Sequence, residues 1–315
     1  MEKKLTIIIP VFNEAKILNY SVTEIEKRLE KLPVKYELLF VDDGSKDDTY
    51  KVLDGISQTN KRVSFISFSR NFGKESAVFA GLENADGDAC VIMDCDLQHP
   101  PEFIYQMVDL WLTGEVDVID AVKATRGKES IFYKISSLTF NVMMNKLTSL
   151  NLKDSSDFKL LDKKVITEIL KCKEKTRFFR GLSEWVGFRH KKIEFNVAER
   201  TVGTSKWSLT KLIKYSIDNI VTFSSIPLKL ISFFGFFVIF LSIALIGQTV
   251  YMKLVGHAVE GFTTVIISIA FFSGTILLSL GVIGEYMSKI YEEIKGRPIY
   301  ILKKSKNNEN TSKSN

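Results

Sequence analysis

The sequence predicts an α/β fold, a mostly parallel sheet with helices on both faces, followed by two helices that cross a membrane. Two observations lead to this prediction. Short apolar runs alternate with helical patterns in the N-terminal third of the chain, and two long uncharged stretches lie near its end. A chain of 315 residues with 45% hydrophobic residues can fill one core and leave apolar sequence over for these stretches.

The expected strands are short apolar runs bounded by polar residues. They cover residues 5–11, 37–41, 63–68 and 89–93. Between the first two strands, apolar residues recur at spacings of three and four from Ile17 to Leu32, which predicts an amphipathic helix. A second helix is expected over 47–56, and Pro100 and Pro101 precede a third that begins at Glu102.

Four polar clusters follow these strands directly. In a parallel sheet, ligands bind at the carboxyl ends of the strands, so these clusters are expected to converge on one edge. They are Phe12-Asn13-Glu14, Asp42-Asp43-Gly44-Ser45, Arg70-Asn71-Phe72-Gly73-Lys74 and Asp94-Cys95-Asp96-Leu97-Gln98.

The two uncharged stretches run from Leu230 to Met252 and from Gly261 to Gly284. Each would form a helix of roughly 35 Å, long enough to cross a hydrocarbon core of about 30 Å. Lysines and arginines lie before the first stretch and after the second, while the turn between them has only Lys253. Because cations collect on the cytoplasmic side, we expect the N-terminal domain and both termini in the cytoplasm, bound to the cell membrane.

Two amphipathic segments, near residues 128–148 and 206–227, carry apolar stripes opposed by polar or basic residues. The stripes suit a membrane surface, although the first could equally pack on the protein's own core. The resulting boundaries are an N-terminal α/β domain over 1–205, a juxtamembrane helix over 206–227, spans over 228–253 and 261–284, and a basic tail over 285–315.

The sequence does not support several other classes of protein. The three cysteines lack CxxC spacing, which fits a reducing compartment, and the three histidines lack the spacing of a zinc site. No GxGxxG motif follows the first strand and no P-loop motif occurs, so neither a dinucleotide fold nor a P-loop kinase is indicated. The net charge of +6 lies mostly near the spans, where it suits anionic lipid, and no nucleic acid partner is expected.

The Asp94-Cys95-Asp96 motif ends an apolar strand. Two carboxylates at this place could bind Mg²⁺ or Mn²⁺, with diphosphate oxygens completing the coordination shell. Asp42 and Asp43 have two interpretations that are compatible. They can shape a strand-to-helix turn, and they can accept hydrogen bonds from a nucleotide base or ribose.

Seven blocks of the sequence resemble the polyprenyl-phosphate glycosyltransferases of inverting glycosyltransferase family 2, to which dolichol-phosphate mannosyltransferase and bactoprenol glucosyltransferase belong. The resemblance covers essentially the whole chain, in the family's order. The blocks are PVFNE (10–14), VDDGS (41–45), SRNFGKESA (69–77), MDCDLQHPPE (93–102), SSDFKL (155–160), RFFRGLSEWVGF (177–188) and ERTVGTSKWSL (199–209).

The resemblance implies a GT-A fold, a Rossmann-like sheet, with a nucleotide diphosphate sugar as donor and a polyprenyl phosphate as acceptor. It also implies the residues of each site. The nucleotide would be bound by Pro10, Phe12, Asn13, Glu14, Asp42, Asp43, Ser45, Lys74 and Asp94, and the metal by Asp94, Asp96 and Gln98.

The residues expected to be catalytic are Asp96 and Asp157, and Asp157 matches the position proposed in the family as the base. A base is not obviously required, because a phosphate nucleophile with a second pKa of about 6 is already largely ionised. Asp157 would then position the acceptor or stabilise positive charge in the transition state.

An anionic acceptor calls for cations near the membrane surface. The expected lipid-phosphate residues are Arg126, Lys134, Arg200 and Lys206, with Arg177 and Arg180 as further residues at the rim.

Several alternatives stay open at this point. The preferred donor is a UDP-sugar carrying glucose or N-acetylglucosamine; a GDP-mannose donor, or a non-catalytic membrane scaffold that keeps the fold, would fit the same sequence. A processive polysaccharide synthase is disfavoured because the chain lacks a QxxRW block and has only two spans. Further partners would be a second copy of the chain and a flippase for the lipid-linked sugar, in a pathway of cell-envelope glycosylation.

Overall fold

The computed structural model describes residues 2–123, 156–175, 177–195, 226–256 and 261–303. The chain divides into two units, residues 1–206 with 297–315 and residues 207–296. The predicted amphipathic segment near 128–148 and most of the one over 206–227 lie outside the described residues.

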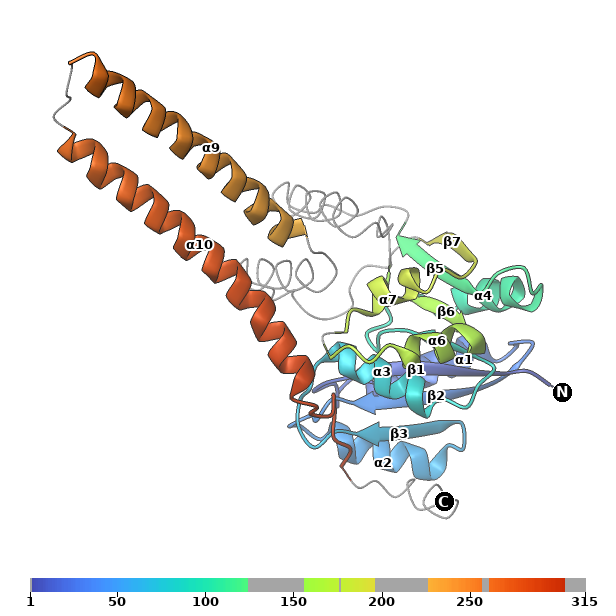
Figure 1. The fold of residues 1–315 in the computed structure, drawn as a ribbon. Coiled ribbons are helices and arrows are strands. Elements are labelled where there is room, and N and C mark those ends of the chain that lie inside the picture. Colours follow the sequence, from blue (N-terminus) through green and yellow to red (C-terminus); the bar gives the residue numbers. More distant parts are fainter. Residues whose placement is uncertain (1, 124–155, 176, 196–225, 257–260, 304–315) are drawn as a thin grey trace. The chain divides into compact units, whose positions relative to one another are not determined.

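The described residues of the larger unit form a sheet of seven strands in the order β3-β2-β1-β4-β6-β5-β7 (Figure 1). The strands are β1 (Lys4–Val11), β2 (Lys35–Asp42), β3 (Val63–Ser67), β4 (Ala89–Ile92), β5 (Val118–Lys123), β6 (Lys159–Asp162) and β7 (His190–Phe195). Strand β6 runs antiparallel to both of its neighbours, β4 and β5, and the other pairs are parallel. The predicted α/β fold with a mostly parallel sheet is confirmed.

Helices cover both faces of this sheet. The helices α1 (Leu18–Leu29), α2 (Thr49–Thr59) and α4 (Phe103–Leu112) contribute to one hydrophobic cluster on the first face. On the opposite face, α3 (Lys74–Asn84) packs against β1 and β2 and contacts α6 (Lys163–Lys171) and α7 (Phe179–Trp185).

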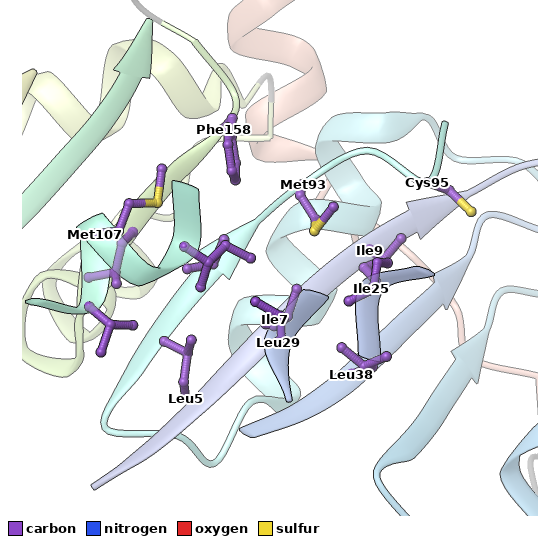
Figure 2. Close-up of a cluster of buried hydrophobic side chains, with 14 of the residues drawn as sticks. Leu5, Ile7, Ile9, Ile25, Leu29, Leu38, Met93, Cys95, Met107 and Phe158 are labelled. Carbon is purple, nitrogen blue, oxygen red and sulfur yellow. The ribbon is translucent and has the colours of Figure 1, made fainter. Parts of the chain in front are cut away.

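The alternation of side chains along β1 explains how both faces are filled. Ile7 and Ile9 point into the cluster that also holds Ile25 of α1 (Figure 2). Ile8 points the other way, because successive side chains of a strand face opposite sides. There it meets Gly81 of α3, where a Cβ atom would lie 2.3 Å from Ile8 Cγ2. Glycine at this position therefore lets α3 approach the sheet closely.

The order of the strands places a switch point beside β1. The chain runs from β1 outward to β2 and β3 and then returns to β4 on the other side of β1. In open α/β sheets, ligands bind at such a point, outside the carboxyl ends of the strands. The fold thus directs attention to the residues that follow β1, β2 and β4.

The second unit contains α9 (Ile226–Leu254) and α10 (Phe262–Ile294), which contact each other. Both are long and apolar enough to cross a membrane, with mean hydropathies of 2.6 and 2.3 over an 18-residue window of each helix. Large apolar side chains lie exposed along them, such as Phe233 (74%) and Leu254 (82%), which suits a lipid environment. Helix α10 continues ten residues beyond Gly284, the predicted end of the second span, and this continuation carries several charges.

The segment predicted as one basic tail, 285–315, has two parts in the structure. Residues 285–294 belong to α10, while Leu302 forms an antiparallel bridge with Phe68, just past the end of β3. The second part belongs to the larger unit.

Candidate active site

A cavity of about 380 Å³ opens at the carboxyl ends of the central strands, and all four predicted polar clusters contribute to its lining. The lining residues are Pro10, Val11, Phe12, Glu14, Asp43, Asn71, Gly73, Lys74, Ala77, Asp94, Cys95 and Asp96. The expected convergence of these clusters on one edge of the sheet is therefore present. Their assignment to nucleotide or metal remains a prediction.

Asp43 organises the side of the cavity next to β2. Its carboxylate accepts hydrogen bonds from Asn71 Nδ2 (2.8 Å), from the Phe72 amide (2.6 Å) and from the Gly73 amide (2.9 Å). Burial raises the pKa of Asp43, and the two backbone amides partly offset this increase. Three donors from the loop that follows β3 thus bind the Asp43 carboxylate.

Backbone geometry around this loop is unusual. Gly44 has a φ of +65°, and a Cβ atom there would lie 2.2 Å from the carbonyl carbon of Arg70, so only glycine allows this approach. Gly73, which precedes α3, has a φ of +98°. Asn13 and Leu97, the non-glycine residues with positive φ in the described part of the chain, also lie at this edge. Such conformations gather at functional sites, where the surroundings hold them in place.

Three predicted nucleotide residues brace the turns and are not among those that line the cavity. Asp42 accepts from the Ser45 amide (3.0 Å), and its other oxygen accepts from Ser67 Oγ (2.7 Å). The Ser45 hydroxyl in turn accepts from the Asn13 amide (2.8 Å). These contacts join the loops after β1, β2 and β3 into one framework.

The antiparallel strand β6 brings Asp157 to the same edge. Ile92, the last residue of β4, pairs with Lys159, the first residue of β6. Continuing this register by two residues sets Asp94 opposite Asp157. A strand that runs against its neighbours starts where they end, so a residue that precedes β6 meets residues that follow β4.

Lys74 lies between these two carboxylates. Its ammonium is 2.6 Å from Asp94 Oδ1 and 3.2 Å from Asp157 Oδ2. Burial alone would lower the pKa of Lys74, but the two carboxylates outweigh burial and hold it above its ordinary value. Lys74 is therefore a permanent cation at the first residue of α3.

Arg180 of α7 forms a bidentate pair with Asp157, at 2.6 Å from Nε to Oδ1 and 3.0 Å from Nη2 to Oδ2. Burial would raise the pKa of Asp157, but Arg180 and Lys74 together hold it well below its usual range. Asp157 is thus an ionised carboxylate with very little affinity for a proton.

Glu75 connects α3 to α7 behind this pair. Its carboxylate accepts a hydrogen bond from the Phe179 amide (2.8 Å), next to Arg180 in the chain. Burial, with a smaller contribution from Asp157, raises the pKa of Glu75 to about 7.

The residues predicted to bind a metal fit a divalent cation. Asp94 and Asp96 line the cavity with oxygen ligands, and Gln98 donates to Asp96 through its amide nitrogen (2.8 Å) and its backbone (3.1 Å). Within the described ranges, no cluster of three His, Cys, Asp or Glu forms a complete cage. Two carboxylates without a cage suit Mg²⁺ or Mn²⁺, which take their remaining ligands from substrate phosphates and water.

His99 supports this motif from behind. The Asp94 amide donates to His99 Nδ1 (3.1 Å), and the ring stacks on Phe158 with centroids 4.8 Å apart. Burial lowers the pKa of His99, which agrees with a neutral ring that accepts at Nδ1.

Comparison with known proteins assigns the chain to a family. The sequence model described as glycosyl transferase family 2 matches residues 6–170. The chain belongs to this family. The resemblance seen in the sequence blocks is thereby confirmed.

Relatives in this family match along nearly the whole chain. An uncharacterized glycosyltransferase of Bacillus subtilis, YkcC, is 40% identical over 97% of this chain and 95% of its own length. A bactoprenol glucosyl transferase of Shigella flexneri, derived from prophage SfII, is 34% identical over 96% and 98%. A solved structure of glucosyl-3-phosphoglycerate synthase from Mycobacterium tuberculosis, with Mn²⁺ and UDP-glucose, is 21% identical, with coverages of 70% and 77% and a TM-score of 0.49.

The predicted lipid-phosphate residues of this glycosyltransferase are not described by the structure. Arg126, Lys134, Arg200 and Lys206 all fall in the ranges 124–155 and 196–225. Their role therefore stays a prediction. Arg180, which the sequence suggested for the rim of the same site, is bound to Asp157.

Sequence reasoning did not assign a role to Glu75 or a partner to Asp157. The only signal for Arg180 was its place in the block RFFRG. Its contact with Asp157 depends on the packing of α7 beside α3, which no local pattern indicates.

Proposed function

We propose that this glycosyltransferase transfers a sugar from a UDP-sugar, carrying glucose or N-acetylglucosamine, to undecaprenyl phosphate on the cytoplasmic face of the membrane. The observation that carries the proposal is the cavity at the switch point, where two carboxylates suited to a divalent cation lie beside the permanent cation Lys74, which also contacts the ionised Asp157. The near full-length similarity to a bactoprenol glucosyl transferase supports the choice of acceptor.

The donor would occupy the cavity with its nucleoside beside Asp43 and its diphosphate beside Lys74 and Asp94. Asp43 is held by its three donors, so its position does not depend on the ligand. Lys74 can pair with a diphosphate oxygen in place of Asp94, since both are anionic partners within reach of one flexible side chain.

Asp94 and Asp96 would hold Mg²⁺ or Mn²⁺, with Gln98 orienting the Asp96 carboxylate. Such an ion, when bound, neutralises the charge that develops on the departing nucleoside diphosphate. Lys74, which contacts Asp94 directly, adds a second positive charge that the protein itself supplies.

Transfer would proceed with inversion by a single displacement. A phosphate oxygen of the lipid attacks the anomeric carbon as the bond from that carbon to the β-phosphate oxygen breaks. The electron pair of the broken bond leaves with the nucleoside diphosphate. No proton must be removed, because the acceptor phosphate, with a second pKa of about 6, is largely ionised at neutral pH.

Asp157 would accordingly act by its charge and position. Its depressed pKa, caused by Arg180 and Lys74 against the effect of burial, makes it a poor base. It holds Lys74 and Arg180 at the place where the two phosphate groups would meet, and its own charge suits the oxocarbenium-like carbon of the transition state.

The two apolar helices would keep the enzyme at the membrane that contains its lipid acceptor. Both exceed the length needed for a span, and the basic residues outside the turn favour a cytoplasmic catalytic unit. A flippase could then take the lipid-linked sugar onward, and association into oligomers would bury the exposed apolar faces of the helices.

The proposal can be tested with purified full-length protein in nanodiscs. We expect it to form a lipid-linked sugar, detected by mass, from undecaprenyl phosphate and one of a panel of UDP- and GDP-sugars. The product should require Mg²⁺ or Mn²⁺ and disappear with a chelator. Product from GDP-mannose alone would replace the UDP-sugar proposal, and no product from any donor would favour the non-catalytic scaffold.

A further inference from the structure

A short segment that follows the second apolar helix in the sequence binds beside the loop that holds Asp43. We call residues 299–303 the return segment. Its backbone pairs with the last residue of β3 and the chain just past it: the Ser69 amide donates to the Ile301 carbonyl (2.9 Å), and the Lys303 amide donates to the Ser67 carbonyl (2.8 Å). Leu302 is the antiparallel partner of Phe68.

This pairing extends the edge of the sheet. Strand β3 is the outermost strand on its side, and the Phe68 amide donates inward to the Asp42 carbonyl (2.9 Å). The neighbouring backbone groups of Ser67 and Ser69 point outward and would lack partners without the return segment. Unpaired groups of an edge strand are a place for another strand to add.

Side chains fix the return segment at this place. Tyr300 stacks on the buried ring of Phe68, with centroids 4.9 Å apart and an angle of 16° between the planes. The Tyr300 hydroxyl donates a short hydrogen bond to Glu83 of α3. The Lys303 ammonium lies over the ring of Tyr50 in α2, 4.6 Å from its centroid. The return segment thus contacts β3, α2 and α3 together.

The chain that it contacts leads directly into the cavity. Ser67 donates to Asp42, and four to six residues after Ser67 come the three groups that bind Asp43. Phe68 also packs edge to face on Phe72, with centroids 5.7 Å apart. The rings of Tyr300, Phe68 and Phe72 therefore form a continuous row, and the backbone amide of Phe72 donates to Asp43.

We propose that Tyr300 is a positioning residue for nucleotide binding: through Phe68 it holds the loop 69–73 in the conformation that presents Asp43, Asn71 and Lys74 to the cavity. The inference rests on the proposed function, because it requires that the cavity binds a nucleoside diphosphate. It makes the affinity for that nucleotide depend on a residue that follows the second apolar helix. The contacts fall at the last residue of β3 and just past it, so they act mainly on the loop and leave the pairing of β3 with β2 intact.

The test compares Tyr300→Ala and Tyr300→Phe with the parent protein, all full-length in nanodiscs. Binding of UDP with Mn²⁺ is measured by calorimetry, and the KM for the donor and for undecaprenyl phosphate are measured separately from kcat. We expect Tyr300→Ala to weaken UDP binding and raise the donor KM by about tenfold, which corresponds to about 1.4 kcal/mol. The KM for the lipid and kcat should change little.

Tyr300→Phe keeps the stack on Phe68 and loses the contacts of the hydroxyl with Glu83 and Asn84, so it should restore most of the affinity. Tyr20→Ala, which removes a tyrosine that is 58% exposed on α1, is the matched control and should leave UDP binding unchanged. Normal UDP affinity in a folded Tyr300→Ala protein, or an equal loss in Tyr20→Ala, would overturn the proposal.

Hydrogen exchange separates this proposal from the proposed function. Without any nucleotide, the Phe72 and Gly73 amides should exchange faster in Tyr300→Ala than in the parent, because their bonds to Asp43 open more often. Unchanged exchange at these amides contradicts the positioning role. A parent protein that binds no nucleotide contradicts the proposed function, and the exchange measurement still decides whether Tyr300 holds the loop.

Discussion

The two halves of the candidate active site hold their carboxylates in different ways. In the donor half, after β1, β2 and β3, Asp43 is surrounded by amide donors that belong to the fold. In the transfer half, after β4 and before β6, Asp94 and Asp157 are held by the side chains of Lys74 and Arg180. Amide donors stay in place when a ligand arrives, whereas a lysine can exchange one anion for another.

This difference indicates a division of labour. The donor half is built before the ligand binds and would set affinity for the nucleotide. The transfer half is a set of charges that neutralise one another and would rearrange when the diphosphate, metal and lipid phosphate enter. Substitutions in the two halves should therefore change different kinetic constants.

The largest effect is expected at Asp157. Asp157→Asn keeps the shape of the side chain but removes the charge that holds Arg180 and Lys74. We expect kcat to fall by about 10²- to 10³-fold, the usual cost of losing one charge-stabilising group, with the donor KM little changed. Asp48→Asn, at an aspartate with a 70% exposed side chain, is the control. Near-normal turnover in Asp157→Asn would remove Asp157 from the transfer half.

In the donor half, Asp43→Asn should act on binding. The amide keeps one acceptor oxygen but loses the charge and one acceptor for the three donors around it. Hydrogen bonds to a charged group contribute about 1.5–3 kcal/mol, so we expect UDP affinity to fall by about tenfold or more. Calorimetry measures the affinity. A loss of kcat with normal affinity would contradict the division of labour.

Lys74→Gln tests whether the lysine competes with the metal. Removing the ammonium frees Asp94, which lies 2.6 Å from it, so Mn²⁺ should bind more tightly in the absence of nucleotide. We expect roughly a fivefold gain, because an exposed ion pair contributes up to about 1 kcal/mol. Titration by electron paramagnetic resonance measures bound Mn²⁺, with Lys51→Gln as the control at an 82% exposed lysine. Weaker Mn²⁺ binding would show that Lys74 does not occupy the place of the ion.

The smallest effect is a pH dependence at Glu75, behind the transfer half. Burial raises its pKa to about 7 from an unfolded value of about 4.3. Between these values the folded state keeps a proton that the unfolded state releases, so the protein loses stability as pH rises through this window. Glu75→Gln cannot ionise, and the gain in its melting temperature over the parent should increase from pH 5 to pH 8. A gain that is the same at both pH values would contradict the raised pKa.

The parts of the site that sequence reasoning found share one property. Strands β1 to β4 consist mainly of apolar residues, so their ends, and hence Asp43 and Asp94, could be located by inspection. The position of Asp157 came from a family resemblance, because β6 contains the buried Lys159 and does not look like a strand.

Charges inside the strands hid the second half of the sheet. Lys159 of β6 pairs with Asp120 of β5 at 2.7 Å, and His190 of β7 contacts the same aspartate at 3.1 Å. Each of these polar side chains interrupts the apolar pattern of its own strand, and its partners lie on a neighbouring strand and on α7. These residues are far apart in the sequence, so local sequence patterns do not reveal that they pair.

The return segment was not predicted from the sequence either. Residues 285–315 were predicted as one basic tail, although residues 299–302 (IYIL) form a short apolar run between polar neighbours. Their partner, Phe68, lies more than two hundred residues earlier in the chain.

The reversed direction of β6 also bears on how such enzymes can diverge. The chain leaves the site after β4 and returns to it before β6. The two ends of the segment between Asp94 and Asp157 therefore lie side by side. Lengthening a loop whose ends are already fixed costs little free energy. Residues 97–123 include Gln98, His99 and β5, which bond the carboxylate motif or pair with β6. The place for new acceptor preferences to arise on an unchanged reaction centre is therefore the stretch between Lys123 and Ser156.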